Sequence, residues 1–105
     1  MKDIQNEDFL KFLLFKEGNE AAFEYFFYKF QNHIVGFCVQ FIHDENDAKG
    51  ITQEAFLHLW NQKEQIETVN GISSFLYTYA KSRCLNIIRH QKVKAKYANK
   101  TLNKR

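Results

Sequence analysis

The sequence has 105 residues and no proline, which suits one domain of long helices and excludes two separately folded domains. Its formal charge of +3 hides an imbalance typical of a chain that contacts a polyanion: residues 1–80 hold all twelve acidic residues and six basic ones, whereas residues 81–105 hold nine basic residues and no acid. No apolar run is long enough to span a bilayer and the N-terminus lacks an apolar signal stretch, so we expect a cytoplasmic protein without a membrane partner.

Residues 4–43 show apolar residues at helical spacing. Residues 4–16 form a short amphipathic segment, after which Gly18 supplies a stop and Asn19 an N-cap. From Asn19 onward the apolar residues recur at steps of three and four. This spacing predicts a helix of about six turns with one wide apolar face, which the segment HDEND (43–47) ends.

A third helix is predicted from the N-cap Asp44 to about Gln62, and it is apolar on two sides. One face carries Ala48, Ile51, Ala55 and Leu59, and the other carries Gln53, Phe56, Leu57 and Trp60. Such a helix is either sandwiched in the core or in contact with a partner. Both alternatives stay open for the two aromatic residues, but the polar residues Gln53, Glu54 and Asn61 border the apolar stripe as they would at an interface edge.

The segment KEQIETVNGIS (63–73) is polar, contains Asn70 and Gly71, and is predicted to be a loop. A fourth helix is predicted from Ser73 or Ser74, fraying after Val93. We therefore expect an all-α fold: a compact bundle of three main helices plus a short N-terminal helix in residues 1–93, followed by a basic linker or tail in residues 94–105. For that tail, a solvated segment and a binding role both remain open. The predicted core residues are Phe23, Phe27, Phe30, Ile34, Ile51, Ala55, Leu59, Leu76, Ala80, Cys84 and Ile87.

The residue types that carry catalysis are scattered. The four histidines show no metal-site spacing, and the acidic clusters read as helix starts, where carboxylates are favoured. Cys38 and Cys84 are isolated in the sequence and are most simply explained as small core residues. We expect neither an enzyme nor a metal site nor a cofactor.

Three segments together resemble a known family: GNEAAFEYFFYKFQNHIVGFCVQFI (18–42), DAKGITQEAFLHLWNQ (47–62) and SFLYTYAKSRCLNIIRHQK (74–92). A Gln-Glu pair, an aromatic-Leu-x-x-Trp step and a later Leu-Tyr, Cys-Leu-Asn and Arg series occur in order. Over roughly residues 9–93 the chain resembles conserved region 2 of a bacterial RNA polymerase sigma factor of the extracytoplasmic-function (ECF) class.

The resemblance implies that the third helix docks on the clamp helices of the largest subunit of core RNA polymerase. The implied polymerase-binding residues are Gln53, Glu54, Leu57, Trp60 and Asn61. It further implies that the loop and the fourth helix open the promoter at its −10 element and hold the displaced non-template single strand. The candidate DNA-binding residues are Thr68, Asn70, Ser73, Ser74, Lys81, Ser82, Arg83, Asn86, Arg89, His90 and Lys92. An anti-sigma factor is a further candidate partner.

The residue types of the fourth helix agree with this implied role. Proteins that hold single strands combine basic groups for phosphates with aromatic, hydroxyl and amide groups for bases. Phe75 and Tyr79 are aromatic residues that we expect mainly in the core.

The chain also departs from the family pattern. Lys49 and Gly50 stand where the family has acids, Ser82 where Asn is common and Asn86 where Asp is common. A complete factor of this class adds a second helix-turn-helix domain for the −35 element, so we expect an excised domain or a truncated protein.

Two alternatives belong to other classes. An all-helical protein-interaction module without DNA binding would explain the two-sided third helix but not the nine positive charges of residues 81–105. A sequence-specific duplex binder would place the fourth helix in the major groove. Preference for single-stranded over duplex DNA separates the sigma hypothesis from the second alternative, and loss of all DNA binding would favour the first.

Overall fold

The computed structural model describes residues 2–103, with side chains described for residues 7–97. Its elements are α1 (Lys2–Lys16), α2 (Glu20–Ile42), α3 (Glu45–Asn61), a short 3₁₀-helix η1 (Lys63–Gln65) and α4 (Val69–Asn103). No strand occurs between residues 2 and 103. The predicted all-α bundle with three main helices and a shorter N-terminal one is therefore confirmed.

Local capping fixes where α2 and α3 begin. The side chain of Asn19 accepts a hydrogen bond from the backbone N–H of Ala22 at 2.8 Å, and that of Asp44 accepts one from Asp47 at 2.9 Å. Both residues satisfy a backbone donor that has no partner inside the helix. α2 ends at His43, which takes a left-handed conformation with φ of 56°. Both predicted N-caps are confirmed.

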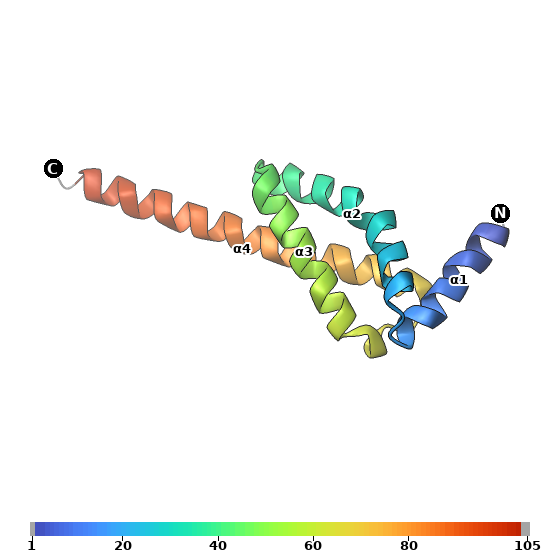
Figure 1. Cartoon of the computed structure of the whole chain (residues 1–105). Helices are drawn as coiled ribbons and strands as arrows, with labels where there is room; N and C mark the ends of the chain where they lie inside the picture. Colours follow the sequence, from blue (N-terminus) through green and yellow to red (C-terminus); the bar gives the residue numbers. More distant parts are fainter. Residues whose placement is uncertain (1, 104–105) are drawn as a thin grey trace.

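The predicted bounds of the fourth helix are wrong at both ends. α4 begins at Val69 rather than at Ser73 or Ser74, because the side-chain oxygen of Thr68 accepts a hydrogen bond from the backbone N–H of Gly71 and caps the first turn. Only residues 62–68 connect α3 to α4. The helix also continues past Val93 to Asn103, and every residue from Arg89 to Tyr97 is exposed, as α4 projects beyond the bundle (Figure 1).

The core lies where α2, α3 and α4 pack against one another. Of the predicted core residues, Ile34, Ile51, Ala55, Leu59, Leu76, Ala80 and Cys84 are buried, whereas Phe23, Phe27, Phe30 and Ile87 are only partly buried. Phe26 is the fully enclosed ring of α2. For the first half of α2, the prediction chose the wrong face as the buried one. It did not include α1 in the core, although Phe12 and Phe15 of this helix are buried as well.

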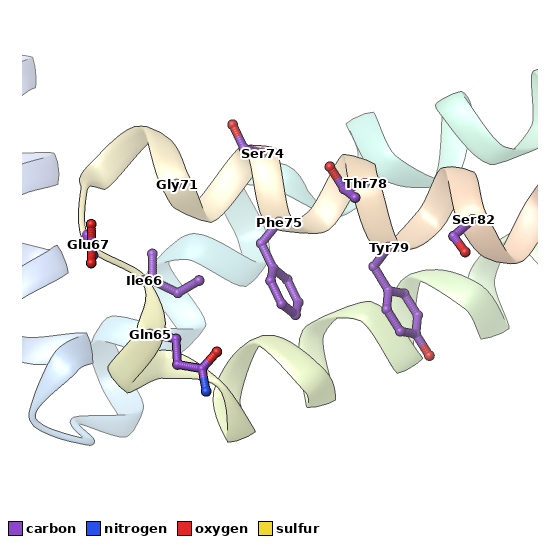
Figure 2. Close-up of a pocket in the computed structure, with 9 residues that line it drawn as sticks. All are labelled: Gln65, Ile66, Glu67, Gly71, Ser74, Phe75, Thr78, Tyr79 and Ser82. Atoms are coloured by element: carbon purple, nitrogen blue, oxygen red, sulfur yellow. The ribbon is translucent and has the colours of Figure 1, made fainter.

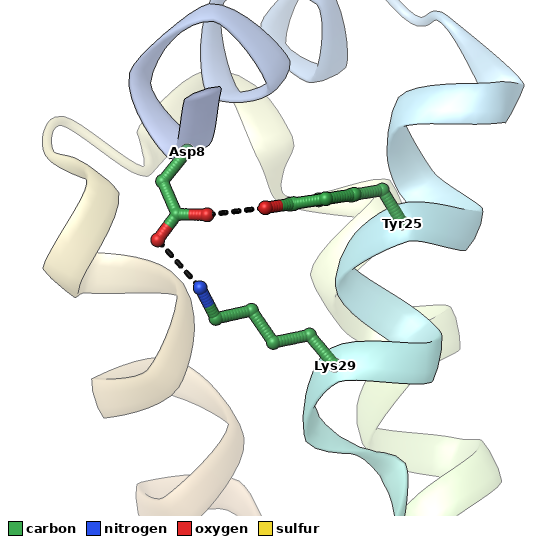
Figure 3. A network of polar contacts seen from close by, with 3 residues as sticks. All are labelled: Asp8, Tyr25 and Lys29. Atoms are coloured by element: carbon green, nitrogen blue, oxygen red, sulfur yellow. Dashed lines mark hydrogen bonds and ion pairs between the residues drawn. The ribbon is translucent and has the colours of Figure 1, made fainter. Parts of the chain in front are cut away.

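Polar contacts tie α1 to the rest of the fold. Asp8 accepts hydrogen bonds from the Tyr25 hydroxyl at 2.6 Å and from the Lys29 ammonium at 2.5 Å (Figure 3). Partial burial raises the pKa of Asp8, but the hydrogen bonds from Lys29 and Tyr25 and the charge of Lys29 outweigh this and lower it overall. The same contact raises the pKa of Tyr25 to about 12.

Lys16, at the end of α1, holds the connection between α3 and α4. Its ammonium donates to the backbone carbonyls of Glu64 at 2.8 Å and Ile66 at 2.6 Å. A Cβ added to Gly71 would lie 3.1 Å from a methyl carbon of Ile66, so the first turn of α4 packs closely on this connection. The connection is thus held by α1 and packed against the start of α4.

Candidate nucleic-acid interface

A groove of about 590 Å³ runs along α4 beside the connection from α3 (Figure 2). Its lining residues are Gln65, Ile66, Glu67, Gly71, Ser74, Phe75, Thr78, Tyr79 and Ser82. Because Ile66 is buried and anchored by Lys16, one end of the groove is held in place. The groove is large enough to admit a planar group the size of a nucleobase.

Phe75 and Tyr79 form the aromatic wall of the groove. Their ring centroids are 6.5 Å apart and their planes differ by 11°, and Figure 2 shows both rings on the same side of α4. Both side chains are partly buried. Tyr79 also contacts the imidazole of His58 on α3, with ring centroids 4.8 Å apart. The wall therefore offers apolar ring surface, and the contact with His58 of α3 supports it.

A row of hydroxyl groups runs along the same part of α4. Ser74, Thr78 and Ser82 follow one another at steps of four residues and all line the groove. A hydroxyl group both donates and accepts hydrogen bonds, so it can pair with either kind of group on a base edge. The groove thus combines stacking surface with hydrogen-bonding groups.

Arg83 lies beside the groove but is already paired. Its Nε donates to Oε1 of Glu54 on α3 at 3.0 Å, and the hydroxyl of Tyr79 donates to the same oxygen at 3.3 Å. The hydrogen bond to Glu54 and its negative charge raise the pKa of Arg83. Desolvation, followed by the charge of Glu54, raises the pKa of Tyr79. This contact joins one residue of the predicted polymerase face to one of the predicted DNA face.

The structure brings only some of the candidate DNA-binding residues together. Ser74 and Ser82 line the groove, and Asn86, Arg89 and His90 line a smaller hollow of about 130 Å³ further along α4. Lys81 and Lys92 are exposed.

Three further candidates lie at the start of α4 and do not line the groove. Thr68 caps the helix, and Ser73 donates to the backbone carbonyl of Asn70 at 3.1 Å. The loop predicted for residues 63–73 is wrong from Val69 onward, because α4 already begins there.

Sequence reasoning missed Thr78, Gln65 and Glu67 as groove residues and expected Phe75 and Tyr79 mainly in the core. The step of four from Ser74 through Thr78 to Ser82 was visible in the sequence and could have identified the hydroxyl row. Gln65 and Glu67 gave no such signal, because their position depends on how the connection folds back on α4.

The outer face of α3 forms a second surface, with Leu57 63% exposed. Hollows of about 320 and 230 Å³ flank this side chain, and α2 contributes Phe23 to both. Gln53 and Asn61 are exposed. The surface is an apolar patch with a polar border.

The two aromatic residues of α3 that could have been core or interface differ in their surroundings. Phe56 is buried. Trp60 is only partly buried: it packs on Phe15 and Phe23 and lies under the ammonium of Lys63, 4.3 Å from the ring centroid. Trp60 therefore supports the core and still borders the exposed patch.

The cysteines belong to the core. Cys38 and Cys84 are free thiols and fully buried, and burial together with the neighbouring Cys84 thiol raises the pKa of Cys38 to about 12.

Within the described residues there is no group of three or more His, Cys, Asp or Glu side chains that could hold a metal ion. No helix in that part of the chain is long and apolar enough to cross a membrane.

Comparison with known proteins identifies the family. The family model described as "Sigma-70 region 2" matches residues 26–93, which is more than half of the chain. The chain belongs to the sigma-70 region 2 family. The matched residues include the groove, its aromatic wall and the α3 residues of the exposed patch around Leu57, whereas Phe23 of that patch precedes them.

One curated relative of this sigma-70 region 2 chain is the RNA polymerase sigma-H factor of Pseudomonas aeruginosa. The two are 29% identical over 65 residues, which cover 62% of this chain and 34% of the relative. The chain thus spans about a third of the length of the curated relative it matches. No solved structure shows a significant match.

Proposed function

We propose that this chain is the domain of an ECF-class RNA polymerase sigma factor that binds core polymerase, and that recognises and melts the promoter −10 element during transcription initiation. The observation that carries the proposal is the groove on α4, which is lined by both the two-ring wall and the hydroxyl row within a region 2 domain. Its role is binding in the cytoplasm rather than catalysis, without a cofactor.

The groove suits a base that has left the DNA stack. A base in a melted strand offers a flat surface for stacking and an edge for hydrogen bonds. Phe75 and Tyr79 supply the stacking surface, and Ser74, Thr78 and Ser82 supply neutral hydrogen-bonding groups. Because a duplex keeps its bases stacked, the groove favours a single strand, which we assign to the displaced non-template strand.

Phosphate binding comes from exposed cations along α4. Arg89 and Lys92 are exposed beyond the groove, and Lys81 is exposed one residue before Ser82. Basic groups at these positions can follow the backbone of a strand whose base lies in the groove. The groove would therefore supply sequence preference and the cations most of the affinity.

The exposed patch on α3 is the proposed docking surface for the clamp helices of the polymerase. Leu57 stands between two hollows and is bordered by Gln53 and Asn61. Interfaces commonly combine such an apolar centre with a polar rim. The patch lies on α3 and α2, whereas the groove is lined by α4 and the connection, so both partners can bind at once.

The test measures binding of a labelled non-template −10 strand to the chain assembled with core polymerase, over a range of salt concentrations. If three cations each neutralise a phosphate, the slope of log affinity against log salt is about −2 for a single strand. Arg89→Ala is expected to reduce the slope by about 0.7 and to weaken binding to all sequences.

Other outcomes would point to other functions. Tighter binding to the duplex than to the single strand would favour major-groove recognition. Polymerase binding without any effect on DNA binding would favour a protein-interaction module.

A further inference from the structure

Glu67 lines the groove from the connection, between two residues that the fold holds in place (Figure 2). Before it, Ile66 is buried, and its carbonyl accepts a hydrogen bond from the Lys16 ammonium at 2.6 Å. After it, the side chain of Thr68 accepts a hydrogen bond from the backbone N–H of Gly71 at 3.1 Å and caps α4. The backbone at Glu67 is therefore positioned from both sides, although the residue itself is exposed.

The carboxylate of Glu67 is available to a ligand. Within residues 7–97, whose side chains are described, it takes part in no ion pair and accepts no hydrogen bond. The hydroxyl of Tyr79, by contrast, already donates to Glu54 at 3.3 Å. A group that enters the groove thus meets a carboxylate whose capacity to accept hydrogen bonds is unused.

The other polar side chains that line the groove can adapt to either kind of hydrogen-bonding partner. The hydroxyls of Ser74, Thr78 and Ser82 both donate and accept, and a hydroxyl hydrogen rotates to suit its partner. The amide of Gln65 offers an oxygen that accepts and an NH₂ group that donates. An ionised carboxylate only accepts. Among the described side chains that line the groove, Glu67 therefore has a fixed polarity that the hydroxyls and the amide lack.

A fixed acceptor discriminates between bases by their exocyclic groups. Cytosine and adenine present an amino donor next to a ring nitrogen that accepts, and guanine presents an amino donor next to a ring N–H. Thymine instead has a carbonyl oxygen on each side of its single N–H. The negative charge of Glu67 attracts an amino group and repels carbonyl oxygens. The groove should therefore distinguish thymine from the other three bases.

We propose that Glu67 is a specificity-determining residue of the groove: it accepts a hydrogen bond from the exocyclic amino group of the unstacked base and disfavours thymine. The amide of Gln65 can then donate to the ring nitrogen beside the amino group of cytosine or adenine. This inference rests on the proposed function and names the class of base that the groove takes.

The experiment measures binding of fluorescein-labelled homopolymer strands to the chain assembled with core polymerase, with core polymerase alone as the background. Strands of about twelve nucleotides match the usual span of a single-strand site. A homopolymer presents the same base in every register, so no promoter sequence has to be known. Oligodeoxycytidine is compared with oligodeoxyuridine, in which a carbonyl oxygen replaces the amino group. Oligodeoxyadenosine is compared with the corresponding purine strand that lacks the amino group.

Two variants of equal charge separate base recognition from electrostatics. Glu67→Gln keeps the shape of the side chain and gives it a donor as well as an acceptor. Glu64→Gln is the matched control, because it removes the same charge three residues earlier, and its exposed side chain does not line the groove.

The wild-type complex is expected to bind oligodeoxycytidine about tenfold more tightly than oligodeoxyuridine, the lower end of the range for a hydrogen bond to a charged group. Glu67→Gln should bring this ratio close to one. The preference for oligodeoxyadenosine over the amino-free purine strand should fall in the same variant. Glu64→Gln should keep both ratios at their wild-type values, because it changes the charge near every strand equally.

Three results would overturn the role of Glu67 and leave the proposed function standing. These are equal wild-type binding of strands that differ only in the amino group, an unchanged ratio in Glu67→Gln, and an equal change of the ratio in Glu64→Gln. If no variant of the complex bound any strand above the background of core polymerase, the proposed function itself would be wrong.

Discussion

Phe15 of α1 packs edge-on against Phe26 of α2, with ring centroids 6.1 Å apart and planes at 71°. Both rings are fully enclosed, with 0% and 1% of their surface exposed. The N-terminal helix is therefore part of the core, and this contact determines which face of α2 is buried.

Phe26→Ala is expected to lower the free energy of unfolding by about 3–5 kcal/mol, because it removes a fully buried ring and leaves a cavity. Tyr28→Ala is the control on the exposed face of the same helix and should change stability by less than about 0.5 kcal/mol. Urea denaturation measures both. A loss under about 1 kcal/mol for Phe26→Ala would contradict the burial of this ring.

The contact of Asp8 with Tyr25 and Lys29 should depend on pH. Because the folded-state pKa of Asp8 lies below its usual 3.8, the ionised form stabilises the fold above that pH, and this contribution is lost as the pH falls below 3.8. Asp8→Asn should therefore be less stable than the wild type at neutral pH. Thermal unfolding across this range should show the difference shrinking below pH 3.8; a difference that grows on acidification would contradict the lowered pKa.

Gly50→Ala is expected to stabilise the chain by roughly 0.5–1 kcal/mol, because Ala is the better helix former and, apart from the adjacent residues and the backbone of α3, no atom lies within 4 Å of the added Cβ. Gly18→Ala should do the opposite, since Gly18 has a φ of 90°, which is strained for other residues. Chemical denaturation of both variants checks the pair. Loss of stability at position 50 would show that α3 is packed on that side.

The docking patch predicts a variant that binds polymerase poorly and folds normally. Combining Gln53→Ala with Leu57→Ala removes exposed side chains, so the free energy of unfolding should change by less than about 0.5 kcal/mol. Loss of a central interface side chain should weaken polymerase binding about tenfold, which corresponds to about 1.4 kcal/mol. Phe56→Ala is the contrasting buried control. Equal losses of binding and stability in the surface variant would contradict the patch.

The hydroxyl row predicts changes in sequence preference rather than in overall affinity. Thr78→Val keeps the shape and removes one hydrogen-bonding group, which is worth about 0.5–1.5 kcal/mol at the base it contacts. Preference among −10 sequences should then change by roughly two- to tenfold, with an unaltered salt slope. Ser73→Ala is the matched control, because Ser73 bonds to the Asn70 carbonyl and does not line the groove. A uniform loss across all sequences would argue against base recognition by Thr78.

Local chemistry allowed much of the fold to be predicted from the sequence. Asn19 and Asp44 cap their helices through hydrogen bonds to residues three positions later, so no distant contact is needed. The spacing of apolar residues likewise predicted an all-α bundle and part of its buried core, including Ile34 and Leu59.

The start of α4 needed both local and distant information. Asn70 and Gly71 predicted a turn, yet Thr68 caps a helix there. Gly71 allows Ile66 to approach the first turn, and Ile66 is held in turn by Lys16, fifty residues earlier in the chain. Residues 69–73, which the sequence predicts to be a loop, are thus helical because the tertiary fold fixes the position of the connection before them.

The sequence by itself determined the N-caps of α2 and α3, the all-α class, the charge of residues 81–105 and the motifs that indicated the family. The tertiary structure decided which face of α2 is buried, where the groove lies and which charges remain available. Glu54 and Arg83 are 29 residues apart, and neither shows in sequence that it neutralises the other. Such pairings depend on how α3 and α4 pack, because a hydrogen bond requires two side chains to meet within about 3 Å in space.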